Sequence, residues 1–513
     1  MATQSLGFAE SERDLRPKSV SGERSFLRRG ATAIYVSCLL IAISLWFVAI
    51  RAPLWLDETG SYWQISHGLS DIWSRHAATL DFPSYSYILG LSAKILGTSE
   101  IALRVPSVLA MLGAAYVFYL AARKLFKRDL SIFLTTIFCL HATVSFAAID
   151  VRPYACAELA INAVILVLLT LRKNDSNWLA ALLGVLTALI ISFQFLFAVF
   201  VPAVVICFFA IKDADRRTVW RQFGVACGAF LLASLPLLPG ILRLFETRGS
   251  HVYEAPPGLI DLLVTFTSMW MLPVAAAVAL FALLTSHRQS WIVRPRRSET
   301  WRNVLCLSLA LVPLFILFSV SRWTTIHMFA PRHRLVAIPG IALLWGLVFE
   351  RWVAKPLQLL FCVLLVVATA SYCLVSPSAK KHGIFIWKSA LVAAERNASV
   401  DDAPVLICSG FVESNYGPMP SNPKDSWLFT PLSYYKLTVP VVPLPYHLND
   451  ETIRDGSRFL AQAIPEHQRF LGMAPKTAPE TLDWLRQKTT STYTVRQVGI
   501  FDQVIVLEFR PRE

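Results

Sequence analysis

The segment ATAIYVSCLLIAISLWFVAI, residues 31–50, decides the fold because it is a long apolar run without a charged side chain. An α-helix needs about 20 such residues to cross the hydrocarbon core of a bilayer. Runs of roughly 17–25 apolar residues recur from Ala31 to Val375. Across the whole chain 55% of the residues are hydrophobic and only 16% are charged, against about a quarter charged in soluble domains. The sequence therefore predicts an α-helical polytopic membrane protein.

The apolar runs and the polar breaks between them predict about eleven transmembrane helices. The expected spans lie near residues 31–50, 102–122, 130–148, 155–171, 178–192, 195–211, 222–240, 263–286, 304–320, 335–349 and 356–375. A long loop, residues 51–100, separates the first span from the second. Within it, Ser84–Leu96 is apolar but too short to span comfortably. We expect this segment to form an interfacial or re-entrant helix.

The net charge of +14 is spread over short basic clusters between the apolar runs. Examples are Arg123-Lys124, Arg172-Lys173 and Arg216-Arg217. Short loops rich in Lys and Arg mark the cytoplasmic side of a membrane protein. This bias predicts a chain in a bacterial inner membrane, with a disordered N-terminus, residues 1–30, in the cytoplasm. It also explains the positive charge without a nucleic-acid partner.

The C-terminal residues 376–513 have a different composition from the membrane module, residues 31–375. Their apolar stretches have strand length, as in Pro404–Cys408, Leu437–Val442 and Gln503–Phe509, and Pro479–Gln487 has a helical pattern. Because the last span ends outside, we expect a small soluble α/β domain in the periplasm.

Two adjacent acids, Asp57 and Glu58, follow the first span at its outer end. A charge at the mouth of a span is costly unless it has a role or a partner. The alternative is that both are ordinary hydrated loop acids just past a helix end. The sequence leaves both interpretations open.

A second polar set, Asp150-Val151-Arg152-Pro153-Tyr154, opens the fourth expected span on the same side. An acid, an arginine and a tyrosine at one depth are able to build a polar pocket against the first set. The alternative is a simple helix start with Pro153 in the first turn and Asp150 as its cap. Both interpretations are compatible with each other.

A third outer loop carries three basic residues in Pro331-Arg332-His333-Arg334. Basic residues on the outer side depart from the charge bias of the other loops. The departure indicates an anion site, with guanidinium groups placed to hold a phosphate at the membrane surface. The alternative is a local exception, since outer loops do carry some arginines.

In this order, the motifs resemble those of the GT-C membrane glycosyltransferases, particularly bacterial members similar to family 39. Relatives in that family include protein O-mannosyltransferases and the enzyme that adds aminoarabinose to lipid A. The matching segments are Leu56-Asp57-Glu58, Asp81-Phe82-Pro83-Ser84-Tyr85-Ser86-Tyr87, Ser99 to Ser107, Asp150 to Tyr154 and Pro331-Arg332-His333. The resemblance covers roughly residues 31–400 and rests on the combination. Phe82, Ser84, Asp150, His333 and Gln194 depart from the common family pattern.

The resemblance implies an enzyme that moves a sugar from a polyprenyl-phosphate carrier to an acceptor hydroxyl of a glycan, lipid or protein at the periplasmic face. It also implies inversion at the anomeric carbon. Our candidate general base is Asp57, because the attacking hydroxyl must lose a proton.

The remaining site residues follow from the charges that such a reaction creates. The candidates for binding the leaving phosphate are Arg152, Arg332 and His333. The candidates for orienting the acceptor or the site are Glu58, Asp81, Asp150 and Tyr154. No cofactor is certain. A divalent metal stays open, with Asp57, Glu58 and Asp150 as its ligands if one binds.

The main alternative from another class is a membrane transporter or flippase of a lipid-linked substrate. Two expectations weigh against it: no charge buried in the middle of a span, and no recognisable inverted repeat. A scaffold protein without catalysis is a further alternative. The sugar, the acceptor, the carrier length and the oligomeric state are not encoded in any motif.

Overall fold

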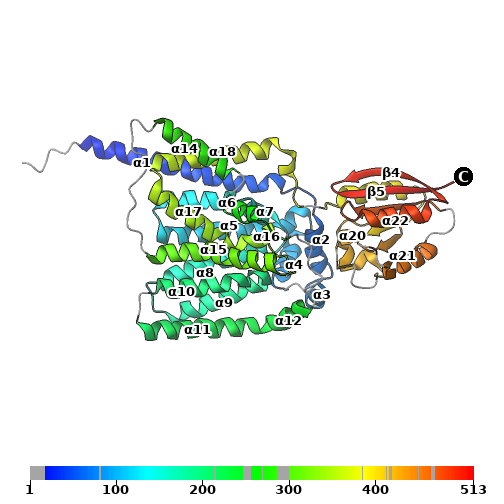
Figure 1. Ribbon diagram of the computed structural model, residues 1–513, viewed down its shortest axis with the longest axis horizontal. Helices are drawn as coiled ribbons and strands as arrows, with labels where there is room; N and C mark the ends of the chain where they lie inside the picture. Colours follow the sequence, from blue (N-terminus) through cyan, green and yellow to red (C-terminus); the bar gives the residue numbers. More distant parts are fainter. Residues whose placement is uncertain are drawn as a thin grey trace, which may run out of the picture.

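The computed structural model describes residues 18–79, 83–212, 215–246, 256–267, 270–285, 300–383, 385–411, 413–414, 419–446, 448, 450–463 and 468–513. Long helices run roughly along one direction as a bundle, and a small sheet domain lies beyond one end of it (Figure 1). The predicted architecture, a helical multi-pass membrane protein with a C-terminal α/β domain, is confirmed.

The helices of the bundle and of its connecting loops follow one another along the chain. Their bounds are α1 Lys18–Leu45, α2 Leu56–Ile65, α3 Ile72–Thr79, α4 Ser84–Leu96, α5 Glu100–Leu125, α6 Arg128–Leu140, α7 Ala142–Ile149, α8 Tyr154–Leu171, α9 Asn177–Phe193, α10 Val201–Ile211, α11 Arg216–Ser234, α12 Leu238–Glu246, α13 Leu259–Thr265, α14 Met271–Thr285, α15 Thr300–Trp323, α16 Pro331–Arg334, α17 Ile338–Trp352 and α18 Lys355–Val375.

Seven helical segments of the described chain are long and apolar enough to cross a bilayer, and the bent pair α6–α7 makes an eighth. Three further apolar helices, Asn177–Phe193, Phe195–Ile211 and Met271–Thr285, are shorter. All of them coincide with expected spans. The number eleven stays a prediction, because the short helices do not reach spanning length by themselves.

One local expectation was wrong, and one expected span is bent. Helix α1 begins at Lys18, so residues 18–30 are helical rather than disordered. The expected third span is broken at His141, where α6 and α7 meet at 69°. The break has a local cause, since His141 leaves the helical conformation and its Nδ1 accepts a hydrogen bond from the Thr143 amide at 3.3 Å. By contrast, the expected non-spanning segment Ser84–Leu96 is α4 with the same bounds.

Two glycines allow helices of the bundle to approach closely. A Cβ at Gly184 would lie 2.2 Å from the Ala226 carbonyl oxygen, and one at Gly340 would lie 2.3 Å from the Leu309 carbonyl carbon. These contacts join α9 to α11 and α17 to α15. Small residues of this kind drive helix association inside lipid, where the hydrophobic effect between helices is lost.

The C-terminal domain is a five-stranded mixed sheet in the order β2-β1-β3-β5-β4. Its elements are α19 Lys388–Ala398, β1 Val405–Cys408, α20 Thr430–Tyr434, β2 Val441–Leu444, α21 Asp450–Ala463, β3 Phe470–Pro475, α22 Pro479–Thr489, β4 Tyr493–Phe501 and β5 Val504–Pro511. Strand β1 pairs in parallel with β2 and β3, while β5 is antiparallel to β3 and β4. The expected strand at Leu437–Val442 lies a few residues later, as β2.

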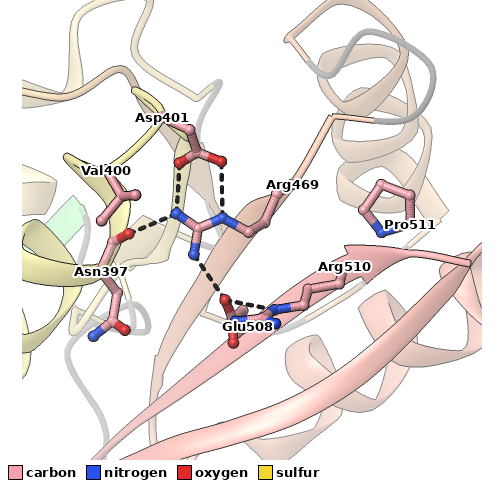
Figure 2. Close-up of a pocket in the computed structure, with 7 residues that line it drawn as sticks. All are labelled: Asn397, Val400, Asp401, Arg469, Glu508, Arg510 and Pro511. Carbon is pink, nitrogen blue, oxygen red and sulfur yellow. Dashed lines mark hydrogen bonds and ion pairs between the residues drawn. The ribbon is translucent and has the colours of Figure 1, made fainter.

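A network of charges fixes one side of this domain (Figure 2). Arg469, at the start of β3, donates to Asp401 at 2.5 Å and to Glu508 at 2.7 Å. Arg510 contacts the same Glu508 at 3.0 Å. Hydrogen bonds from Arg469 lower the pKa of Asp401, so this carboxylate stays ionised beside its partner. The charges satisfy each other, which indicates a structural network that holds β3, β5 and the turn after α19 together.

The first long loop is packed into the core of the C-terminal domain. Trp55 and Leu56 are each 5% exposed and share one apolar cluster with Ile386, Trp387 and Leu391. Figure 1 shows α2 and α3 at the end of the bundle that faces α20. The C-terminal domain therefore packs directly against the loop that follows α1.

Polar contacts also hold the C-terminal domain in this seat, which is its contact surface with the first loop and α5. The Leu54 amide donates to the Tyr435 hydroxyl at 2.7 Å, and the hydroxyls of Thr59 and Thr430 lie 2.9 Å apart. Lys388 and Glu100 form an ion pair at 2.8 Å between α19 and α5. Hydrogen bonds fix the orientation that the apolar contact alone would leave adjustable.

Gly383→Ala is expected to loosen this seat. Gly383 has φ +75°, and an added Cβ would lie 2.1 Å from Cγ of Trp55. Gly68→Ala is the matched control, because Gly68 has φ +102° with nothing within 4 Å of its Cβ position. We expect Gly383→Ala to cost about 1–3 kcal/mol more than the control, measured as thermal unfolding of the detergent-purified protein. Equal losses for both variants would mean that the contact with Trp55 contributes nothing.

Candidate functional site

The site is built on the first turn of α2. Trp55 caps this helix, and the Glu58 carboxylate accepts a hydrogen bond from the Trp55 amide at 3.2 Å. A carboxylate at this position also favours the helix N-terminus electrostatically. The turn places the two neighbouring acids in different environments: the side chain of Asp57 is 21% exposed, while Glu58 is fully buried.

Glu58 forms a buried ion pair with Arg104 of α5. Arg104 donates from Nε to Oε1 at 3.1 Å and from Nη2 to Oε2 at 2.7 Å, and both side chains are 0% exposed. Arg104 also donates to the carbonyl groups of Ile50 and Ala52, which ties down the chain after α1. Burial raises the pKa of Glu58, while His382 and Arg104 act in the opposite direction. Glu58 is therefore a buried residue that holds the start of α2 in place.

Asp150 lies between α7 and α8 and is 0% exposed. Its Oδ1 accepts a hydrogen bond from Nε1 of Trp55 at 3.0 Å and lies 3.3 Å from Nε2 of His382. Its backbone carbonyl accepts from the Ser107 hydroxyl at 2.6 Å. The Val151 amide donates to Glu58 at 3.0 Å. The segment from Asp150 therefore contacts the segment around Glu58, as expected. Both carboxylates are buried at this contact.

Asp57 meets the third polar set. Its Oδ2 lies 3.2 Å from Nη1 of Arg332 in α16, and each side chain is 21% exposed. These two residues are far apart in the sequence, so only the folded bundle brings them together. Next to Arg332, His333 is 6% exposed and its Nδ1 lies 2.8 Å from the Met328 carbonyl, which leaves Nε2 as the other polar atom of the ring.

The remaining predicted residues lie around this pair. The Tyr154 hydroxyl, at the start of α8, is within electrostatic range of Asp57, Asp150, Arg152 and Arg332. Arg152 is partly buried and Tyr154 is 2% exposed. Asp81 lies outside the described residues. The three loops therefore meet at one end of the bundle, with Asp57 and Arg332 partly exposed there.

Three residues of the site were not predicted: Arg104, Trp55 and His382. Arg104 had a usable signal, because an arginine within an apolar span needs a buried partner or a function. Trp55 and His382 had none, since their contacts join parts of the chain that are distant in sequence. His382 is 2% exposed and comes from the linker after the last span.

One group of side chains has the donor types of a metal site. Oxygen atoms of Glu58 and Asp150 and a ring nitrogen of His382 lie within 4.8 Å of one another. The Glu58 oxygen nearest to His382 already accepts hydrogen bonds from Arg104 and from Val151. A cation there would have to displace both and stand beside a guanidinium group, so this arrangement fits a resident metal poorly.

One charge is buried near the end of a span, although none was expected in the middle of one. Glu158 lies one turn inside α8 and is 0% exposed, with Asn162 donating to its side chain at 3.4 Å. One oxygen of Glu158 has no hydrogen-bond partner within the described structure. A buried acid in a span is a common feature of transport pathways. The clustering of the other polar groups at one end of the bundle weighs against a transporter.

The comparisons with known proteins concern the fold and the family of the chain. A family model described as dolichyl-phosphate-mannose-protein mannosyltransferase matches residues 77–241. ArnT from Cupriavidus metallidurans in the apo state has a similar fold, with a TM-score of 0.53 at 13% identity, over 93% of this chain and 98% of that chain. ArnT of the same organism bound to undecaprenyl phosphate gives a TM-score of 0.50 at 12% identity, over 92% and 97% of the two chains. No curated protein sequence matches the chain. The resemblance to the GT-C membrane glycosyltransferases is confirmed.

Proposed function

We propose that this GT-C-type membrane protein transfers a sugar from a polyprenyl-phosphate-linked donor to an acceptor hydroxyl on an envelope glycan, lipid or protein. The single observation that carries the proposal is the pair of Asp57 and Arg332 at 3.2 Å, partly exposed at one end of the bundle. A base and a phosphate-binding cation side by side are what this transfer requires.

The reaction is a displacement at the anomeric carbon. The acceptor oxygen forms the new bond to that carbon while the bond to the phosphate oxygen breaks, and the acceptor proton passes to Asp57. The lipid phosphate leaves with both electrons, and Arg332 and Arg152 are the candidates to stabilise its growing negative charge. Attack opposite the leaving group inverts the carbon. Tyr154 and His333 are placed to orient the sugar or the phosphate.

The ion pair between Asp57 and Arg332 suggests that donor binding comes before proton transfer. In the free protein, Arg332 neutralises Asp57 and makes it a weaker base. A donor phosphate offers Arg332 a second, bidentate partner. We propose that the phosphate draws Arg332 away, so that Asp57 becomes a competent base only when the donor is bound. ArnT of Cupriavidus metallidurans, solved with undecaprenyl phosphate, supports this choice of donor.

The periplasmic location is supported by the distribution of charge along the helices. Arg123 and Lys124 lie in the last turn of α5, and Arg351 lies in the last turn of α17. The site lies near the other ends of these helices, beside the start of α5 and α16. By the charge bias of membrane proteins, the basic ends face the cytoplasm and the site faces outward.

The test of the reaction is release of free polyprenyl phosphate by the purified protein. A panel of polyprenyl-phosphate sugars is incubated with the protein and an envelope extract as acceptor. Release from one donor would support the transferase and identify its sugar. If a folded protein releases phosphate from none of them but moves the lipid-linked sugar across vesicle membranes, the transferase is excluded and the buried Glu158 becomes the starting point for a flippase.

Arg332→Gln is expected to raise the KM for the donor by about 10- to 100-fold, since a hydrogen bond to a charged group contributes about 1.5–3 kcal/mol. The matched control is Arg334→Gln. Arg334 donates to the Asp261 carbonyl at 2.8 Å and to the Thr265 hydroxyl at 2.9 Å, away from Asp57. Steady-state kinetics of the donor distinguish the two. An unchanged KM in Arg332→Gln would remove Arg332 from the phosphate site.

A further inference from the structure

The linker between the last span and the C-terminal domain returns into the polar site. After α18, it carries His382, which is 2% exposed. Nε2 of His382 lies 3.3 Å from Oδ1 of Asp150 and 3.6 Å from Oε1 of Glu58. The imidazole ring stacks on Phe146 of α7 at 4.4 Å with an interplanar angle of 26°. A single linker residue therefore touches both buried acids and the helix that precedes Asp150.

The next residue, Gly383, lies against the first loop. Gly383 has a positive φ, and its backbone lies so close to Trp55 that a Cβ would overlap the indole ring. Trp55 in turn donates from Nε1 to the same Asp150 oxygen that faces His382. Two side chains, one from the first loop and one from the C-terminal linker, thus meet at one buried carboxylate.

These contacts lead to the first turn of α2. Trp55 is the cap of that helix, and Glu58 binds its amide and Arg104. Asp57 lies between the two. A displacement of Asp150 or of Trp55 would therefore move the candidate base relative to Arg332. Asp150 thus joins His382 to Trp55, and the backbone at the start of α2 joins Trp55 to Asp57.

We propose that His382 is a positioning residue, which donates from Nε2 to Asp150 and thereby makes the contact of the C-terminal linker with Asp150 a condition for a correctly placed Asp57. The proposal rests on the function proposed above. It assigns the C-terminal domain a role: through its linker, the domain completes the support of the catalytic turn.

The test compares His382→Ala and His382→Gln with the matched control Lys388→Met. The Gln amide nitrogen reaches the place of Nε2 and keeps the donor. Lys388 holds the start of α19 to Glu100 at 2.8 Å without touching Asp150 or Glu58, so its loss weakens the same docking surface elsewhere. Three quantities are measured for each variant: kcat and donor KM, thermal unfolding, and hydrogen exchange of the peptide covering residues 54–60.

We expect His382→Ala to lower kcat by about 10- to 100-fold, because a small misplacement of a catalytic group is costly, while the donor KM stays the same. His382→Gln should recover most of kcat. Hydrogen exchange over residues 54–60 should rise in His382→Ala and not in Lys388→Met, even if both lose the same thermal stability. Lys388→Met should keep the wild-type kcat.

Three results would overturn the proposal. One is a fall in kcat that follows thermal stability equally in His382→Ala and Lys388→Met, which would make the role merely structural. Another is unchanged exchange over residues 54–60 in His382→Ala. A third is one bound divalent metal in the wild type that both His382 variants lack, which would replace the hydrogen bond by a ligand. If the wild type turns over no donor, the proposed function fails, and the exchange measurement alone still decides whether His382 fixes the turn.

Discussion

Asp57→Asn is expected to lower the rate of sugar transfer by about 10²- to 10⁴-fold, the usual contribution of a general base. The amide has the size of the carboxylate but cannot accept the proton of the acceptor hydroxyl. Because the side chain is partly exposed, the change leaves no buried charge without a partner and should not disturb the fold. The measurement is release of polyprenyl phosphate under single-turnover conditions, which separates chemistry from product release.

The control for this variant is Asp71→Asn in the same loop. Asp71 accepts a hydrogen bond from the Ser70 hydroxyl at 2.9 Å and takes no part in the site. We expect it to keep the wild-type rate. Equal rates for Asp57→Asn and the wild type would remove Asp57 as the base. The fully buried Asp150 would then have to become accessible through a rearrangement of the linker.

Arg104→Met is the variant with the largest expected effect on stability. It leaves the buried Glu58 carboxylate without its partner and frees the carbonyl groups of Ile50 and Ala52. Removing one member of a buried ion pair typically costs about 3–5 kcal/mol. The measurement is the free energy of unfolding in detergent.

The double variant Glu58→Gln with Arg104→Met provides the control for this explanation. It removes both charges, so it should regain part of the stability that Arg104→Met loses, by about 0.5–3 kcal/mol of coupling. If the losses of unfolding free energy in Glu58→Gln and in Arg104→Met simply add up to the loss in the double variant, the two side chains do not interact. A single variant as stable as the wild type would contradict the structural role of Arg104.

The sequence predicted those parts of the fold that depend on local composition. Apolar runs located the spans, because a bilayer requires length and hydrophobicity from each helix separately. The same reasoning separated α4 from the true spans, since Ser84–Leu96 is apolar but short. The three motifs were found because acids and arginines stand out beside apolar spans, and the structure brings Asp57, Asp150 and Arg332 to one end of the bundle.

Long-range contacts could not be predicted. Nothing near His382 in the sequence indicates that it reaches Asp150, because the contact depends on how the C-terminal domain is seated. The different burial of Asp57 and Glu58 was equally hidden, since neighbouring residues of one helical turn point in different directions. The bend at His141 was not predicted either. His141 caps α7, but it lies within a continuous apolar run that reads as a single span. The resemblance pointed to the loops that meet at one end of the bundle, whereas the burial and the partners of their residues follow from packing.

The measurement that tests the account most directly is binding of polyprenyl phosphate to the wild type, Asp57→Asn and Arg332→Gln. If the donor phosphate takes Arg332 from Asp57, Asp57→Asn should bind the lipid phosphate at least as tightly as the wild type, because the competing carboxylate is gone. Arg332→Gln should bind it about tenfold or more weakly. Equal binding by all three proteins, or weaker binding by Asp57→Asn, would contradict a phosphate site at Arg332 beside the candidate base.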